Sequence, residues 1–204
     1  MAAQKRQYRM KRRAELEAQT RLRIAESAAA LHEAVGPAQT SISAIAERAG
    51  VRRSTVYRHF PDEAALFAAC SAHWRAANPA PAVEQWQAID DPHARLRAAL
   101  VELYAFYRRT ERMYANLHRD EKTMPTVQRT FAAFRDYLAA AAEVLMRGRG
   151  LRGGAKKRVH AAIGHALAFP TWQSLAREQG LDDGEAADLM CRFVEVAAET
   201  LSVS

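Results

Sequence analysis

Apolar residues recur every three or four positions along most of the chain, the spacing of helices that bury one face. This pattern predicts a long first helix, which Gly36 and Pro37 end. Its apolar positions are Leu16, Ile24, Ala28, Leu31 and Val35. No segment alternates as a strand does, and no internal repeat is present. The sequence therefore predicts an all-α protein of about nine helices.

Proline, aspartate and glycine mark the ends of the later helices. We expect helices over residues 62–78, from Pro92 onward, over a shorter piece at 111–117, and from Pro125 onward. Residues 148–154, with four glycines, are expected to form a loop. A helix near 155–179, kinked by Pro170, should follow, and a last helix should start at Asp182 or Asp183.

Residues 42–60 have the pattern of two short helices joined by a tight turn. Gly50 can end the first helix in the left-handed conformation, and Ser41 is a suitable N-cap. The positions expected to pack the two helices together are Ile45, Ala46, Ala49, Val51 and Val56. This pattern is typical of a helix-turn-helix, whose second helix enters the major groove of DNA. The side chains that this helix would expose are Arg53, Ser54, Thr55, Tyr57, Arg58 and His59.

The charge of the chain is concentrated in the same region. Residues 1–60 account for the whole formal net charge of +7, because they contain 12 Lys and Arg and 5 Asp and Glu. The rest of the chain contains 18 basic and 18 acidic residues. Six of the basic residues lie in residues 1–13, which contain no acid. We expect this arm to be disordered in the free protein, either as a solvated tail or as an arm that follows phosphates or a minor groove.

From about Ser41 to Leu66 the sequence resembles the tetracycline-repressor-like (TetR) family of bacterial transcriptional regulators. Ile-Ala-Glu-Arg-Ala-Gly-Val, then Thr-Val-Tyr-Arg-His-Phe, then Leu66 stand at the family's spacing. The resemblance implies an N-terminal three-helix helix-turn-helix DNA-binding domain, joined by a connecting helix to a C-terminal helical ligand-binding and dimerisation domain. We therefore expect domains at residues 1–62 and 63–204.

The resemblance also implies a role for individual positions. It implies phosphate or backbone contacts for Ser41, Tyr57 and His59, and base contacts for Arg53, Ser54 and Thr55. A guanidinium such as that of Arg53 can donate two hydrogen bonds to guanine. The ring of Tyr57 could also pack under the helix pair with only its hydroxyl exposed, and we expect both roles to be partly true. Arg52 and Arg58 could contact DNA or be solvated charges. Glu63 stands where the family usually has a lysine near the DNA backbone, so no phosphate contact is assigned to it.

In proteins that this chain resembles, the middle helices enclose a small-molecule site. The expected lining residues are Tyr104, Tyr107, Met113, Phe131, Phe134, His165, Phe169 and Trp172. Each could equally be ordinary core. His165 and Glu102 could be polar anchors for a ligand, or a satisfied core histidine and a surface glutamate.

Residues 159–172 are apolar on almost every face, and the last helix has a wide apolar surface. Such helices need cover on all sides, which either a buried position in one monomer or a homodimer interface provides. We expect the homodimer. The expected interface residues are Leu167, Leu175, Leu189, Phe193, Val196 and Ala197.

Other chemistry is not indicated by spacing. Cys70 and Cys191 are far apart and form no CxxC or Cys/His cluster, so we expect buried, reduced thiols and no metal site or cofactor. No apolar leader or membrane-length apolar run is present, which favours a cytoplasmic protein. No combination of nucleophile, base and orienting residue is apparent, so an enzyme is not expected.

Together these patterns predict a dimeric, sequence-specific regulator that binds an inverted-repeat operator in double-stranded DNA. We expect a repressor that an unknown small-molecule effector releases by changing the separation of the two recognition helices, with residues 62–78 as the lever. The alternatives are a regulator or architectural DNA binder without a small-molecule effector, and a regulator whose C-terminal domain binds a protein.

Overall fold

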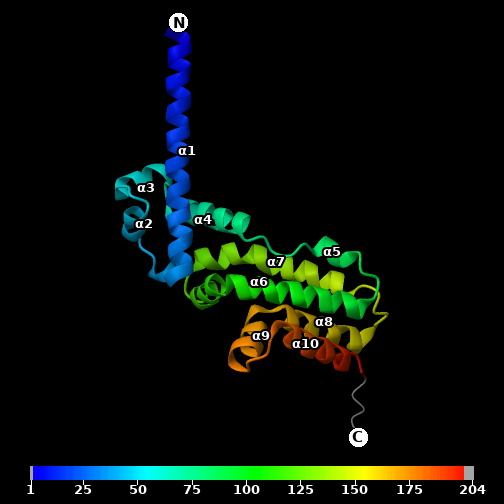
Figure 1. Ribbon diagram of the computed structural model, residues 1–204. Helices are drawn as coiled ribbons and strands as arrows, with labels where there is room; N and C mark the ends of the chain where they lie inside the picture. Colours follow the sequence, from blue (N-terminus) through cyan, green and yellow to red (C-terminus); the bar gives the residue numbers. More distant parts are fainter. Residues whose placement is uncertain (1, 200–204) are drawn as a thin grey trace. The chain divides into compact units, whose positions relative to one another are not determined.

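A computed structural model describes residues 2–199, and within them the fold is all-helical, as predicted (Figure 1). Ten α-helices occur in this part of the chain, one more than expected. They are α1 (Ala2–Val35), α2 (Ile42–Arg48), α3 (Arg53–His59), α4 (Glu63–Ala77), α5 (Val83–Gln87), α6 (Pro92–Asp120), α7 (Pro125–Met146), α8 (Gly153–Leu167), α9 (Phe169–Gln173) and α10 (Asp183–Ala198). A 3₁₀ turn, η1 (Pro37–Gln39), follows α1, and a π-helical turn, η2 (Ser174–Glu178), continues α9.

Packing divides the chain into two compact units. Unit 1 contains Met1–Pro79 and Ala115–Thr130, and unit 2 contains Ala80–Tyr114 and Phe131–Ser204. Helix α4 belongs to unit 1, whereas α6 and α7 each contribute residues to both units. The functional domains at 1–62 and 63–204 remain a prediction, because packing defines units on another criterion. Residues 1 and 200–204, at the ends of those domains, lie outside the described part.

Helix α1 includes the basic arm that we expected to be disordered. It runs without a break from Ala2 to Val35. The physical reason is local, because residues 2–19 are mostly Ala, Gln, Lys, Arg, Glu, Leu and Met, the best helix formers, with no Gly or Pro. The expectation of a disordered arm is therefore wrong, and the arginines are carried on a helix.

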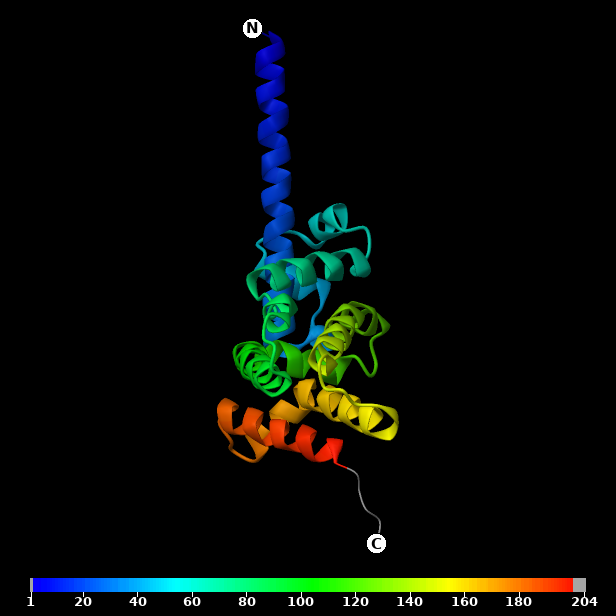
Figure 2. The same cartoon turned by 90° about the vertical axis from the view of Figure 1, so that its right-hand side faces the viewer.

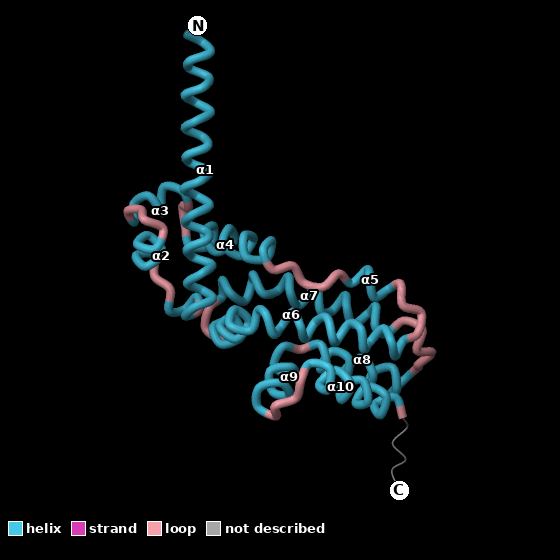
Figure 3. The backbone as a smooth tube through the Cα atoms, in the orientation of Figure 1, coloured by secondary structure: helices cyan, strands magenta, loops and turns pink. Residues whose placement is uncertain are grey.

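Three other helix predictions need correction. Residues 111–117 are not a separate piece but part of α6, since nothing between Pro92 and Asp120 breaks the helix. Helix α5, only five residues long, was missed. Pro170 lies at the start of α9 and accompanies a break at Ala168 rather than a kink (Figure 3).

Two tyrosines stabilise the break between α8 and α9. Ala168 is extended, so the Ala166 carbonyl has no helical amide donor, and the Tyr104 hydroxyl donates to that oxygen at 2.9 Å. The Tyr107 hydroxyl donates to the next carbonyl, that of Leu167, at 2.6 Å. Because buried carbonyls require a donor, these bonds fix where α8 ends.

Candidate functional site

Helices α1 to α4 form one small core in unit 1, on which the helix-turn-helix is built. All five positions predicted to join α2 and α3 contribute to it, four of them buried and Val51 partly so. The buried residues of this core are Ile24, Ala25, Ala28, Ala29, Ile45, Ala46, Ala49, Val56, Phe60, Leu66 and Cys70. Alanine at five of these positions lets the helices approach closely.

The turn between α2 and α3 has the geometry that its sequence predicted. Gly50 is left-handed, at φ +65°. Its amide donates to the Glu47 carbonyl at 3.0 Å, and the Val51 amide donates to the Ala46 carbonyl at 2.9 Å. These two bonds are the Schellman motif, which satisfies the carbonyls left open at a helix end. The direction in which α3 leaves α2 is thus set by one glycine and its neighbours.

Helix α3 presents a polar surface on top of this core. Arg53, Ser54, Tyr57 and Arg58 are exposed, and Thr55 is half-buried. The Arg53 guanidinium donates to the Tyr57 hydroxyl at 3.2 Å and lies 5.6 Å from the centre of that ring. The hydrogen bond raises the pKa of Arg53, which keeps it charged. Tyr57 is 42% exposed, so its ring does not pack under the helix pair.

The C-terminal end of α3 is attached to α1. Arg21 of α1 donates to the carbonyl of His59, and its guanidinium lies 4.1 Å from the centre of the Phe60 ring. The His59 Nε2 is buried and has no hydrogen-bond partner among the described residues, and burial together with Arg58 lowers the pKa of this histidine. This nitrogen is therefore not accessible at the surface of α3. The sequence reasoning missed Arg21, which only the folded structure brings to α3.

Two helix N-termini lie beside this surface. The Ser41 hydroxyl accepts from the Ala44 amide at 3.1 Å and caps α2, as predicted. Asp62 caps α4 by accepting from the Ala65 amide at 2.7 Å, and Glu63 occupies the first turn. Carboxylates are favoured at a helix N-terminus, because its exposed amides carry partial positive charge. The acid at Glu63 thus stabilises α4 at a position where a phosphate contact is not assigned.

The last turn of α6 is hydrogen-bonded to the end of α1 and to η1, the segment that precedes α2. The Asn116 amide donates to the carbonyls of His32 and Glu33, and Arg119 donates to that of Val35 at 2.9 Å. Asp120, almost fully buried, accepts from the Ala38 amide at 2.9 Å and from Arg119 at 2.7 Å. These bonds satisfy the open carbonyls of α1 within unit 1.

In unit 2, most of the predicted lining residues meet in one aromatic cluster centred on Tyr107. Its ring lies 5.3 Å from that of Phe169, 5.9 Å from that of Trp172 and 6.3 Å from that of Phe134. Phe131 lies 5.7 Å from Phe134. Tyr104 and Met113 are also buried. The sequence reasoning missed Phe106, Tyr114 and Tyr137, which join the same cluster. The spacing of Tyr114 with Tyr107 along α6 was a usable signal, whereas Tyr137 lies on α7.

The two proposed polar anchors lie outside this cluster. His165 is exposed, and its ring lies 6.0 Å from that of Phe193 on α10. Glu102 accepts from the indole nitrogen of the buried Trp86 at 2.9 Å, so its carboxylate holds α5. Their role as anchors for a ligand remains a prediction.

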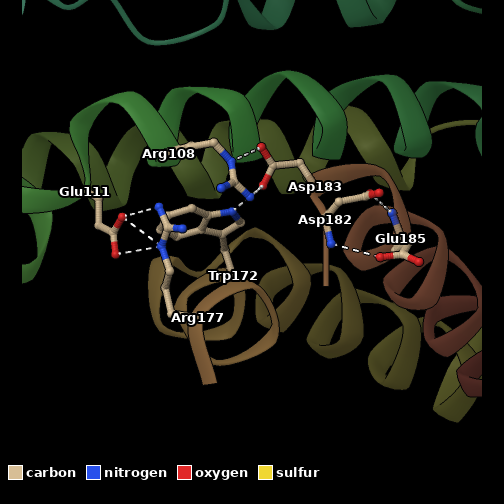
Figure 4. A network of polar contacts seen from close by, with 7 residues as sticks. All are labelled: Arg108, Glu111, Trp172, Arg177, Asp182, Asp183 and Glu185. Atoms are coloured by element: carbon tan, nitrogen blue, oxygen red, sulfur yellow. Dashed lines mark hydrogen bonds and ion pairs between the residues drawn. The ribbon is translucent and has the colours of Figure 1, made fainter. Parts of the chain in front are cut away.

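Hydrogen bonds from charged side chains attach η2 and the start of α10 to α6 around Trp172 (Figure 4). Asp183, at the start of α10, accepts from the Trp172 indole at 2.9 Å and from Arg108 at 2.7 Å, and these donors lower its pKa, Arg108 most of all. Arg177 of η2 donates to Glu111 of α6 at 2.9 Å. Trp172 thereby lies between two guanidinium groups, those of Arg108 and Arg177.

Helices α8 and α10 pack side by side (Figures 1 and 2). Helix α10 also has an exposed apolar face. Leu189, Phe193 and Val196 on that face are 44%, 46% and 57% exposed. Leu175 and Ala197 are half-buried. Leu167, in contrast, is fully buried within its own chain, since it faces the core of unit 2. Leu167 is therefore not available to an interface and is withdrawn from the predicted set.

Both cysteines are buried thiols, as expected, and burial raises the pKa of each to about 11. Among the described residues, no group of His, Cys, Asp and Glu has the arrangement of a metal site. None of the helices in residues 2–199 has the length and apolarity needed to span a membrane.

The comparisons with known proteins agree with this geometry. Residues 24–70 match the family model of bacterial regulatory proteins of the TetR family. No curated protein sequence matches the chain.

Solved structures of similar fold cover most of the chain. A TetR-like transcriptional regulator from Rhodococcus sp. RHA1 is 19% identical, with a TM-score of 0.64 over 90% of this chain and 97% of that one. A putative TetR-family transcriptional regulator from Mesorhizobium loti is 20% identical, with a TM-score of 0.62 over 89% and 96%. AibR, solved with isovaleryl coenzyme A and operator DNA, is 22% identical, with a TM-score of 0.57 over 85% and 97%. The helix-turn-helix region thus matches the TetR family model, and the chain has the all-helical fold of these solved structures.

Proposed function

We propose that this protein is a homodimeric repressor that binds an inverted-repeat DNA operator through α3 and is released by a small-molecule ligand. The observation that carries the proposal is the exposed face of α3. It holds hydrogen-bond donors on a helix whose position is fixed by the Gly50 turn and by Arg21. This combination suits recognition of base edges, which requires donors held in a fixed register.

Arg53 is the residue to which we assign base recognition. Its guanidinium lies along the ring of Tyr57, so the planar donor group is oriented before DNA is met. Ser54 and Thr55, at the same end of α3, complete the base-reading set, and Ser41, Arg52, Tyr57 and Arg58 contact the phosphates. His59 contributes less than the resemblance implied, because its Nε2 is buried.

The exposed face of α10 supports the dimer. Leu189, Phe193 and Val196 are spaced as one side of a helix, and exposed apolar side chains grouped in this way mark protein interfaces. A second copy placed on this face by a twofold axis would cover the same residues of both chains. The dimer would then present two α3 helices to successive major grooves.

The aromatic cluster of unit 2 is the region to which we assign ligand recognition. AibR, of similar fold, was solved with both isovaleryl coenzyme A and operator DNA. This supports the proposal that a protein of this fold can bind both a ligand and DNA. A ligand that separates the rings of Tyr107, Phe169 and Trp172 would strain α6, and α6 ends on the carbonyls of α1. A difference of about 1–3 kcal/mol in affinity for two states is enough to weaken operator binding roughly 5- to 150-fold.

Selection of bound sequences from a random DNA pool tests whether the protein binds DNA sequence-specifically. We expect an inverted repeat whose half-sites are bound with at least about 10³-fold preference over unrelated DNA at physiological salt. Arg53→Ala should relax the preference at one base pair per half-site by about 1–3 kcal/mol, whereas Arg53→Lys should restore affinity without restoring the preference. Recovery of no common sequence would favour an architectural DNA binder and contradict the proposal.

Mass measurement in solution tests the dimer. The chain should behave as a dimer, and the pair of changes Leu189→Glu and Phe193→Glu should yield a folded monomer with weakened operator binding. Glu195→Gln, on the same helix but outside the apolar face, is the matched control and should remain dimeric. A monomeric parent protein would overturn this part of the proposal.

Release by a ligand requires a compound that weakens operator binding. Isovaleryl coenzyme A and a library of aromatic compounds can be screened for thermal stabilisation of the protein, and stabilising compounds can then be added to the operator complex. We expect at least one to lower operator affinity, and Tyr107→Ala to abolish that response. Binding that leaves operator affinity unchanged would exclude ligand-released repression by that compound.

A further inference from the structure

We propose that the N-terminal half of α1 is a second DNA-binding element, whose arginine face lies against phosphates next to the base pairs read by α3. This inference rests on the DNA-binding function proposed above. It concerns a surface outside the helix-turn-helix. Its test distinguishes a failure of this inference from a failure of the proposed function.

The arginines of this segment share one face of the helix. At 100° per residue, Arg6, Arg9, Arg12 and Arg13 fall within an arc of about 120°, whereas Lys11 points to the opposite side. All four arginines are exposed, and the chain contains no acid before Glu15. Within the described part of the protein, only Arg13 of the four forms a salt bridge, with the exposed Glu17 at 3.2 Å. A concentrated positive face is therefore left for a partner.

The helix holds this face at a fixed distance from α3. Arg21, on the same helix, bonds the carbonyl of His59 at the C-terminal end of α3. With a rise of 1.5 Å per residue, Arg12 lies about 13 Å and Arg6 about 22 Å farther along the axis. Figures 1 and 2 both show that this part of α1 stands clear of α2, α3 and α4. The arginines can thus approach DNA that α3 itself does not cover.

The size of the face fits a row of phosphates. The stretch from Arg6 to Arg13 is about 10 Å long, which is the axial length of about three phosphates on one strand. A membrane surface fits less well, because it requires a continuous apolar face beside the basic one. Tyr8 and Met10, the exposed apolar residues of this segment, lie about 160° apart on the helix.

Salt dependence of operator binding tests the inference. The triple variant Arg6→Gln, Arg9→Gln, Arg12→Gln removes three charges but keeps good helix formers. Its control, Lys122→Gln, Lys156→Gln, Lys157→Gln, removes three exposed charges elsewhere. Fluorescence anisotropy with the operator selected by the parent protein, between 50 and 200 mM salt, gives the slope of log Kd against log salt. Circular dichroism checks the helix content of both variants.

We expect the slope to fall by about 0.9 for each phosphate contact removed, or about 2.7 per protomer, only in the α1 variant. Its base preference should remain that of the parent. Lys11→Gln should change the slope by less than Arg9→Gln. If the parent binds the operator and both triple variants retain the parental slope, the α1 face does not touch DNA and the inference is wrong. If the parent selects no operator at all, the proposed function itself fails.

Discussion

The core beneath the helix-turn-helix and the core of unit 2 are filled by residues of opposite size. Around α1 to α4, alanine occupies five of the eleven buried positions of the cluster, and only one of the eleven, Phe60, is aromatic. In unit 2 the largest buried side chains are Trp86, Trp172, Tyr104, Tyr107, Phe106 and Phe169. Close-packed interiors respond to both missing and added volume, so the two cores should be damaged by opposite kinds of substitution.

This difference suits the roles proposed for the two units. A core of small residues brings backbones close together and holds short helices such as α2 and α3 in one arrangement. Aromatic rings that meet at angles between about 20° and 84° offer many surfaces, which a flat or apolar ligand could contact in turn. The core of unit 1 thus fixes the positions of short helices, whereas the core of unit 2 is suited to recognising a small molecule.

The largest effect is expected from lost volume in unit 2. Trp172→Ala removes a fully buried ring together with its hydrogen bond to Asp183 and should reduce the free energy of unfolding by about 3–5 kcal/mol. Tyr8→Ala, at a residue 66% exposed, is the control and should change it by less than about 0.5 kcal/mol. Urea denaturation measures both. Equal, small effects would show that the aromatic cluster is loosely packed.

Acid should destabilise the core of unit 1 almost as strongly. Burial lowers the pKa of His32 to about 4, against a smaller opposing effect of Asp120. The folded state thus disfavours the protonated ring, and its stability falls as pH drops from about 6.5 toward 4, by up to about 3 kcal/mol. Above pH 6.5 this contribution is constant. In His32→Gln the loss between pH 6.5 and 4 should shrink, and an unchanged pH profile would assign the loss to other groups.

Added volume should damage unit 1 by an intermediate amount. Ala46→Leu forces three methylene-sized groups between α2 and its neighbours and should reduce the free energy of unfolding by about 1–3 kcal/mol. Ala64→Leu, at an exposed position of α4, is the matched control and should be nearly neutral. Thermal unfolding and operator affinity can be followed together. A stable Ala46→Leu protein with normal operator binding would contradict the close crossing of α2.

The smallest effect is expected at the turn. A Cβ at Gly50 would meet nothing within 4 Å, so the cost of Gly50→Ala comes from its left-handed backbone alone, about 1 kcal/mol. Gly50→Asn should cost less, because asparagine tolerates this conformation better. If both variants are as stable as the parent, the turn does not depend on glycine.

Sequence reasoning succeeded where structure is specified locally. Ser41, Gly50, Asp62 and Asp182 were identified as helix ends because each bonds to amides or carbonyls within a few residues of itself. The apolar spacing of α2 and α3 was equally informative, since both helices bury one face in the same core. These short-range signals located the candidate DNA-binding surface before its structure was known.

Features that depend on distant residues were not predictable in this way. Arg21 reaches α3 across 38 positions, and Arg119 reaches Val35 across 84, so no local pattern announces either contact. The burial of Leu167 and the exposure of His165 depend on how α8 lies against α6 and α10. Periodicity shows that a helix has an apolar side, but it does not show which neighbour covers it.

The break between α8 and α9 has a consequence for how this sequence can evolve. Because Tyr104 and Tyr107 donate to carbonyls of the last turn of α8, and the extended Ala168 leaves these oxygens without helical amide donors, the two tyrosines and the backbone break are constrained as a group. A descendant with phenylalanine at Tyr104 would hold a dry, unpaired oxygen at Ala166 unless α8 had first been extended through Ala168, which also requires an amide hydrogen at position 170. The order of mutational steps therefore matters.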